Sequence, residues 1–182
     1  MSAIMLTYSG EVFDFDHPGR TVILIEDIAH SLAMQCRYTG HTKKFYSVAE
    51  HCYRMSVANL PGDPMSRLLH DSAEAYISDI AYPLKKNLVY GTYMLPMSLL
   101  EHRIVNVITK ALGLFVIDLK SVKVGDQVMM ATEVRDLMPR ERAELFQDYT
   151  SGQQPLKEKI KPFSPKKAEK LFLRRYYELC NM

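Results

Sequence analysis

A histidine and an aspartate stand side by side at His70-Asp71, inside the apolar stretch MSRLLHDSAEAYISDI. Burying either side chain costs free energy unless it meets a hydrogen-bond partner or a metal ion. His51 lies nineteen residues upstream in SVAEHCYRMS, and Asp126 lies downstream in SVKVGDQVMMA. If three helices bring these residues together, two imidazoles and two carboxylates could hold one divalent ion of Mn, Co, Zn, Fe, Ni or Mg.

Two further carboxylates could take part in chemistry at such a centre. A bound divalent ion lowers the pKa of water and makes hydroxide available near neutral pH. Glu74 stands four residues after His70 and three after Asp71, so a helix would place it on the same side. There it could orient water or move a proton. Asp79 is either a second carboxylate of this kind or a helix-end residue.

The last ligand has a second candidate. Asp136 follows ten residues after Asp126, in EVRDLMP. Its neighbour Arg135 favours an intramolecular ion pair or a helix cap for Asp136, so Asp126 is the preferred ligand. An isolated His or Asp on an apolar helix is more often structural, and only the combination of residues points to a metal.

Length and composition predict a single domain over residues 1–182 with a sizeable core. Hydrophobic residues make up 47% and charged residues 24%, which is typical of soluble globular proteins. The net charge of +2 gives no reason to expect a nucleic-acid or membrane partner. The three cysteines form no CxxC pair, and we expect a reduced, cytoplasmic protein.

The pattern of apolar residues predicts an all-α fold with one small extended element. Residues 3–16 alternate apolar and polar side chains around Ser9-Gly10, which indicates a short β-hairpin or an extended arm. Helical periodicity and end signals then predict helices over 24–39, 47–59, 63–79, 95–112, 119–137 and 165–180. A short connector is expected to begin at Pro83.

These residues resemble the HD-domain metal-dependent phosphohydrolases. CRYTGHTKKFYSVAEH and HDSAEAYISDIAYPLK are similar to segments of bacterial 5′-deoxynucleotidases, and phage-encoded dATP triphosphohydrolases share the outline. The resemblance covers roughly residues 21–137. It implies an HD-domain helical bundle with His51, His70, Asp71 and Asp126 as ligands, in a homo-oligomer. Water activated by the metal would attack the α-phosphorus of a dNTP, releasing triphosphate, or of a dNMP, releasing phosphate; dATP and dAMP are plausible substrates.

The resemblance also implies substrate contacts. Arg37 suits phosphate recognition, with a surface ion pair as the alternative. Tyr38 stands where the relatives often have Trp, at a sugar or base contact. His41 lies in the loop before the first ligand and either touches substrate or belongs to the loop structure. Lys85 is either a polyphosphate contact or a solvated lysine.

Other functions remain open on the same sequence. A non-catalytic HD module that binds a nucleotide or a protein would be expected to lack a ligand or Glu74, and all are present. A nucleic-acid-binding helical protein would need a stronger basic stripe. Cyclic-nucleotide or (p)ppGpp hydrolysis would be other chemistry on the same fold, which alone does not choose the substrate. We therefore expect an enzyme that acts on deoxynucleotides.

Overall fold

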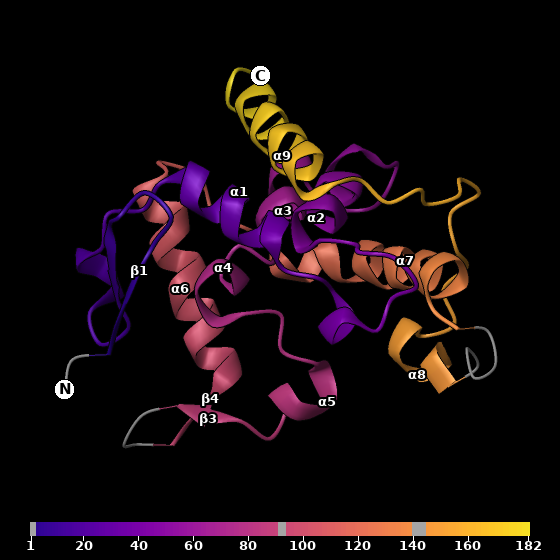
Figure 1. The fold of residues 1–182 in the computed structure, drawn as a ribbon, viewed down its shortest axis with the longest axis horizontal. Coiled ribbons are helices and arrows are strands. Elements are labelled where there is room, and N and C mark those ends of the chain that lie inside the picture. Colours follow the sequence, from indigo (N-terminus) through magenta and orange to yellow (C-terminus); the bar gives the residue numbers. More distant parts are fainter. Residues whose placement is uncertain (1–2, 91–93, 140–144) are drawn as a thin grey trace.

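The computed structural model describes residues 3–90, 94–139 and 145–182. Helices take up 56% of the chain and strands 6%, which confirms the mostly helical fold with a small N-terminal β element (Figure 1). In Figure 1 the C-terminal helix α9 lies at the top, and α5, α8 and the strands β3 and β4 lie at the bottom. Between them α7 runs beside the central helices α2 and α3, and α6 descends on the other side of the molecule toward β3 and β4.

The N-terminal element is a hairpin. Strand β1 (Ile4–Leu6) pairs antiparallel with β2 (Val12–Asp14), and the turn contains Gly10 at φ +90°. The carboxylate of Asp27, on the next helix, accepts hydrogen bonds from the backbone N–H and the hydroxyl of Ser9, at 2.7 and 2.8 Å. The hairpin is therefore fixed to the helical body at its tip.

Helices α1, α2, α3 and α9 pack on one another, and α7 packs on α2 and α3. The helices and short 3₁₀ turns are η1 (Pro18–Arg20), α1 (Ile25–Met34), η2 (Tyr38–Gly40), α2 (Val48–Val57), α3 (Pro64–Leu69), α4 (Glu74–Ile77), α5 (Tyr82–Lys85), α6 (Met97–Ala111), α7 (Leu119–Leu137), α8 (Gln147–Thr150) and α9 (Pro165–Cys180). Their fully buried side chains form the core, among them Ile28, Leu32, Val48, Leu68, Leu69, Ile104, Ile108 and Phe172. This burial is the main source of the stability of the helical body.

Local sequence signals fix where the two central helices begin. The side chain of Ser47 accepts a hydrogen bond from the backbone N–H of Glu50 at 3.1 Å, as the capping box predicts. Asp63 caps α3 in the same way at 2.8 Å, with Pro64 at the first helical position. These caps set the starts of the helix that carries His51 and of the helix that leads to the His-Asp pair.

Two predicted helix boundaries are wrong. The helix expected over 24–39 ends at Met34, because the chain turns into an extended segment at Gln35. Cys36 then forms an antiparallel bridge with Ser47, which replaces helical hydrogen bonds. The helix expected over 63–79 breaks after Leu69, as described with the site below.

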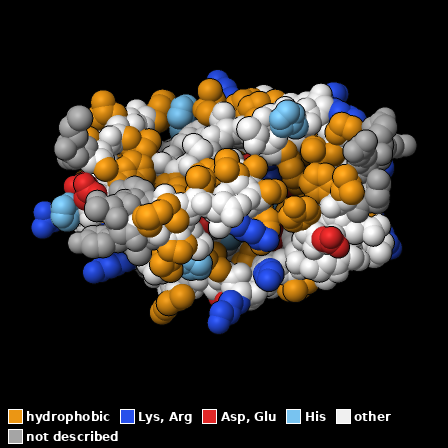
Figure 2. All heavy atoms as spheres, turned by 90° about the horizontal axis from the view of Figure 1, so that it is seen from below, with side chains coloured by type: hydrophobic (Ala, Val, Ile, Leu, Met, Phe, Trp, Pro, Cys, Tyr) orange, Lys and Arg blue, Asp and Glu red, His pale blue; other side chains and the backbone are white. Residues whose placement is uncertain are grey.

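The expected connector after Pro83 has more structure than the sequence predicted. It contains α5 and a short antiparallel pair, β3 (Val89–Tyr90) with β4 (Leu95–Pro96), so α6 begins at Met97 rather than at residue 95. Figure 2 views the molecule from this lower face, where hydrophobic side chains gather around lysine and arginine side chains near the middle. Tyr82 of α5 and Tyr149 of α8 meet edge to face, with ring centroids 5.9 Å apart.

Helix α7 spans Leu119–Leu137, as the sequence predicts. Gly125 on this helix packs against the loop after α2: a Cβ at that position would lie 3.3 Å from the carbonyl oxygen of Pro61. This close approach holds the neighbouring Asp126 near α2 and α3. In the described part of the chain, no helix has the length and apolar character needed to cross a membrane.

Candidate metal centre

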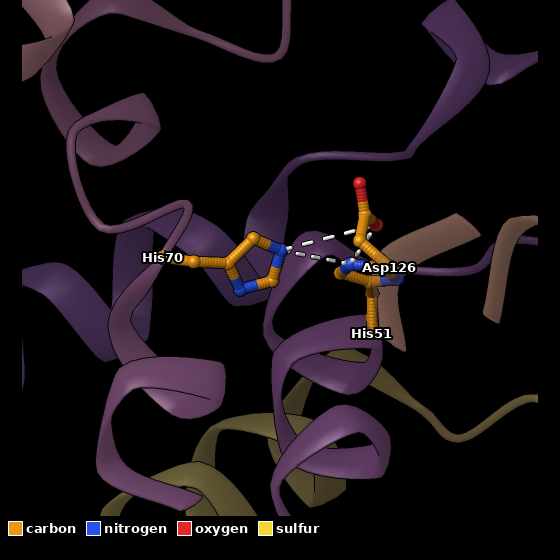
Figure 3. A group of neighbouring side chains, drawn as sticks. All are labelled: His51, His70 and Asp126. Carbon is orange, nitrogen blue, oxygen red and sulfur yellow. Dashed lines mark hydrogen bonds and ion pairs between the residues drawn. The ribbon is translucent and has the colours of Figure 1, made fainter. Parts of the chain in front are cut away.

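The fold brings all four predicted ligands together. His51 lies on α2, His70 and Asp71 lie in the turn after α3, and Asp126 lies on α7. Figure 3 shows the imidazoles of His51 and His70 turned toward each other, with the carboxylate of Asp126 beside them. Each residue therefore reaches the same small volume from a different element.

The donor atoms have separations that suit a single ion. The two Nε2 atoms of His51 and His70 are 3.2 Å apart, and His51 Nε2 is 3.3 Å from Asp126 Oδ1. Asp71 Oδ2 lies 3.3 Å from His70 Nε2 and 3.7 Å from His51 Nε2. Donors about 2.1 Å from one metal are about 3.0 Å apart at right angles and about 3.4 Å apart in a tetrahedron. His51, His70 and Asp126 are thus close enough to hold a metal ion, and Asp71 lies beside both histidines.

The hydrogen bonds of the two imidazoles fix which nitrogens face the centre as acceptors. Nδ1 of His70 is 2.9 Å from the carbonyl oxygen of Arg67, which can only accept, so this nitrogen carries the proton. Nδ1 of His51 lies 2.6 Å from Oε1 of Glu133 and donates to that carboxylate. In the neutral forms both Nε2 atoms then present lone pairs to each other. Two lone pairs and two carboxylates at this distance require a cation between them, which is a proton or a metal ion.

Glu133 is a site residue that the sequence analysis missed. Its side chain is fully buried, and besides His51 it accepts a hydrogen bond from the hydroxyl of Tyr38 at 2.6 Å. It stands seven residues after Asp126 on α7, which is two helical turns, so both side chains share one face. That spacing was the available signal. A carboxylate that orients a ligand imidazole through Nδ1 is common around protein metal sites.

The side chains of Arg37 and Tyr38 lie at the candidate metal centre, where they already interact with carboxylates of the protein. Arg37 is 8% exposed; its Nη1 donates to Asp71 Oδ2 at 3.2 Å, and its Nε lies 3.4 Å from Glu133 Oε2. Tyr38 donates to Glu133 rather than pointing to solvent. Arg37 therefore forms a buried ion pair within the site, rather than the surface ion pair that was its alternative, and Tyr38 joins the same network.

The backbone is strained where these side chains enter the site. Tyr38 has φ +56° and Thr39 has φ +54°, in the left-handed region that β-branched residues rarely adopt. The amide N–H of Arg37 donates to the carbonyl of Tyr46 at 2.9 Å, and Tyr38 is held by Glu133. Such strain persists where surrounding contacts fix the chain, and it is often found at functional sites.

The ionisable groups around His51 shift one another. Burial and Arg37 lower the pKa of His51, yet the carboxylates of Glu133 and Asp126 outweigh them and raise it to about 9. Burial raises the pKa of Glu133, but the charges of Arg37 and His51 lower it to about 2. Burial acts in the same direction on Asp126, and its hydrogen bond to His51 lowers the pKa of that carboxyl well below its usual value. Both carboxylates are therefore ionised near neutral pH.

The chain breaks its helix at the ligand pair. After α3 the backbone makes tighter i to i+3 hydrogen bonds, from Ser72 N–H to Leu69 and from Glu74 N–H to Asp71, before α4 begins. The side chain of Gln35 supports this segment, because it donates to the carbonyl of Glu74 and accepts from the N–H of Asp79. The continuous helix predicted over 63–79 is therefore wrong, because these tighter turns separate α3 from α4. They also set the directions in which His70 and Asp71 point.

Glu74 and Lys85 form a buried ion-pair network next to the ligands. Lys85 Nζ lies 3.4 Å from Glu74 Oε1 and 2.6 Å from Glu101 Oε1. Burial, and then the charges of Asp71 and Asp79, raise the pKa of Glu74 well above its usual value. Burial likewise raises the pKa of Asp79. Lys85 is thus paired with protein carboxylates rather than solvated.

Two predicted candidates lie apart from this network. The side chain of His41 is exposed, and in the described residues no side-chain hydrogen bond connects it to the ligands. Asp136 pairs with Arg135 at 2.7 Å and with Lys159 at 3.4 Å, and it accepts from the N–H of Ile160 at 2.8 Å. Asp126, and not Asp136, lies beside the histidines.

Cys52 adds a sulfur donor near the pair. Its thiol is buried, and one donor atom each from Cys52, His70 and Asp71 lie within 4.8 Å of one another. The sequence analysis expected a reduced thiol here and did not count it among the candidate ligands. Burial, with the charge of Asp71, raises the pKa of this thiol well above its usual value.

A pocket of about 240 Å³ opens beside the ligands. His70, Asp71 and Asp126 lie along it, and α6 and α7 contribute His102 and Lys123. A ligand in this pocket would therefore contact the candidate metal centre. The arrangement can hold a cation and place a small molecule against it.

No protein-family model matches the sequence. The chain is 39% identical to the uncharacterized protein YfdR of Escherichia coli K12 over 132 residues. The matched region makes up 72% of this chain and 70% of YfdR. An uncharacterized protein of Rhodobacter capsulatus is 36% identical over 86 residues, which are 42% of this chain and 44% of that protein. On the first of these matches, the chain belongs to the same protein family as YfdR of Escherichia coli.

Proposed function

We propose that this protein is a metal-dependent phosphohydrolase of the HD-domain type that acts on deoxynucleotides, cleaving at the α-phosphorus. The observation that carries the proposal is the pair of Nε2 atoms 3.2 Å apart, turned toward each other by the oxygen partners of both Nδ1 atoms and flanked by two carboxylates. A metal ion fits this donor set of two imidazoles and two carboxylates. The adjoining pocket gives a phosphate access to it.

His51, His70, Asp71 and Asp126 would hold the ion, and Glu133 orients His51. A bound divalent ion would supply hydroxide near neutral pH by lowering the pKa of water. The charge of Arg37 offsets those of Asp71 and Glu133, which limits the repulsion between the buried carboxylates and an incoming phosphate.

Glu74 is the carboxylate best placed to handle protons. It begins α4 three residues after Asp71, it is 4% exposed, and Lys85 holds one of its oxygens. Its other oxygen, Oε2, is buried without a hydrogen-bond partner among the described residues. We assign to Glu74 the orientation of water or the protonation of the leaving oxygen, and to Asp79 a supporting negative charge.

The test is hydrolysis by purified protein loaded with Mn²⁺ or Co²⁺ and offered separate panels of dNMPs, dNTPs and rNTPs. Asp71→Asn, which keeps the shape of the side chain but removes its charge, should abolish product formation. Asp148→Asn, the same change at an exposed residue of α8, should leave it unchanged. Chromatography of the products would show deoxynucleoside with phosphate or with triphosphate.

A protein that binds the metal but turns over no nucleotide in any panel would overturn the proposal. It would favour a non-catalytic module that binds a nucleotide or a protein. Turnover that persists in Asp71→Asn would also contradict it, because the reaction would then not depend on this centre.

A further inference from the structure

We infer that Lys123 forms an anion subsite beside the metal centre, which takes the phosphate tail of a nucleoside polyphosphate. This inference rests on the proposed function and names the class of its substrate. The starting point is the pocket of about 240 Å³, where Lys123 lines the same space as His70, Asp71 and Asp126.

The cations expected to bind phosphate are already engaged. Arg37 is paired with Asp71 and Glu133, and Lys85 is paired with Glu74 and Glu101. A phosphate would have to displace a buried carboxylate to reach either one, which leaves that carboxylate without its partner. The charge that receives the tail must therefore come from another residue.

Lys123 is such a residue. Its side chain is exposed and makes no ion pair or hydrogen bond with any residue in the described part of the chain. It stands three residues before Asp126 on α7, so both side chains lie on adjacent turns of the same face. A lysine ammonium is a point charge that suits a flexible phosphate chain.

His102 lies across the pocket on α6. Its Nδ1 lies 2.6 Å from the carbonyl oxygen of Ser98 and donates to it, so in the neutral ring Nε2 accepts hydrogen bonds and the positive charge of the subsite comes from Lys123. Glu101 also lines the pocket, but Lys85 balances its charge at 2.6 Å. With a divalent ion bound, the pocket would combine the charge of the metal with that of Lys123. A monophosphate held at the ion has no further phosphate to place there, whereas a triphosphate has two.

The experiment measures binding rather than turnover. Metal-loaded protein, with the metal kept in the buffer and its retention measured, is titrated calorimetrically with inorganic triphosphate and separately with orthophosphate. We expect triphosphate to bind more tightly, and Lys123→Gln to weaken triphosphate binding by about tenfold with little effect on orthophosphate. Lys123→Arg should retain most of the affinity. Lys120→Gln, the same change at an exposed lysine of α7 outside the pocket, should behave as the unmodified protein.

Equal triphosphate binding by the unmodified protein and folded Lys123→Gln would overturn the inference. So would hydrolysis of deoxynucleoside monophosphates alone, which would leave the proposed function intact. Conversely, loss of triphosphate binding in Lys123→Gln, in a protein that hydrolyses no nucleotide, would support the subsite and reject the proposed function.

Discussion

Glu133 decides how His51 is presented to the centre. Its carboxylate lies 2.6 Å from Nδ1 of His51 and also receives the hydroxyl of Tyr38, so it fixes both the tautomer and the plane of the imidazole. Glu133 is fully buried, and its charge is balanced by its neighbours Arg37 and His51. A substitution that removes this charge should therefore weaken metal binding more than it lowers the stability of the fold.

We expect Glu133→Gln to lower the affinity for Mn²⁺ or Co²⁺ by about 10- to 100-fold, the usual effect of losing a residue that orients a ligand. The amide oxygen can still accept from His51, so the loss should be smaller than in Glu133→Ala. Metal titration of folded protein measures it. Glu158→Gln, at an exposed position, is the matched control. An affinity unchanged in both Glu133 variants would show that His51 does not need this partner.

At the scale of the elements, local signals predicted the starts of helices better than their ends. The caps at Ser47 and at Asp63 were readable from the sequence, because a cap depends on residues within one turn. The ends at Met34 and Leu69 were not, because they depend on distant partners. Gln35, for example, ends one helix by bonding to the backbone of Glu74, on a segment far along the chain.

At the candidate site too, residues could be predicted from local sequence, but contacts between distant segments could not. Residue types, spacing and resemblance pointed to four candidate ligands, and the structure brings three of them, His51, His70 and Asp126, close enough to hold one ion, with Asp71 beside both histidines. The pairing of Arg37 with Asp71 could not be foreseen, since no periodicity relates a loop after α1 to a turn after α3. Glu133 was predictable in principle from its two-turn spacing to Asp126.

Asp136 connects the end of α7 to the segment that follows α8, and this connection should depend on pH. The side-chain hydrogen bond from Arg135 lowers the pKa of Asp136 to about 2. A carboxyl with a lowered pKa stabilises the folded state above its unfolded value of 3.8, and loses that contribution as the pH falls through 2. We expect Asp136→Asn to reduce the free energy of unfolding by about 1–2 kcal/mol at pH 7.

Urea unfolding at pH 7, 4 and 2.5 measures this difference, which should shrink toward the lowest pH. Metal affinity should be unchanged in Asp136→Asn and lost in Asp126→Asn, which separates the structural aspartate from the ligand. A difference in stability that is the same at every pH would show that the charge of Asp136 is not responsible.

For the molecule as a whole, the candidate centre lies where three elements of the fold meet. His51 comes from α2, the His-Asp pair from the turn between α3 and α4, and Asp126 from α7 (Figures 1 and 3). The fully buried side of the site includes Glu133, whose charge needs a compensating cation nearby. An ion bound at this position would therefore cross-link three parts of the fold and bind the folded state alone.

Removing the metal should lower the melting temperature. A ligand at 100 times its Kd that binds only the folded state adds about 2.7 kcal/mol, which for a chain of this size raises Tm by about 5–10 °C. Thermal unfolding with Mn²⁺ or Co²⁺ and again after chelation measures the shift. Asp126→Asn should show almost none, because it lacks a ligand but keeps its core, whereas Asp136→Asn should show the full shift from a lower starting temperature. A shift of equal size in Asp126→Asn would place the stabilising ion somewhere other than between these helices.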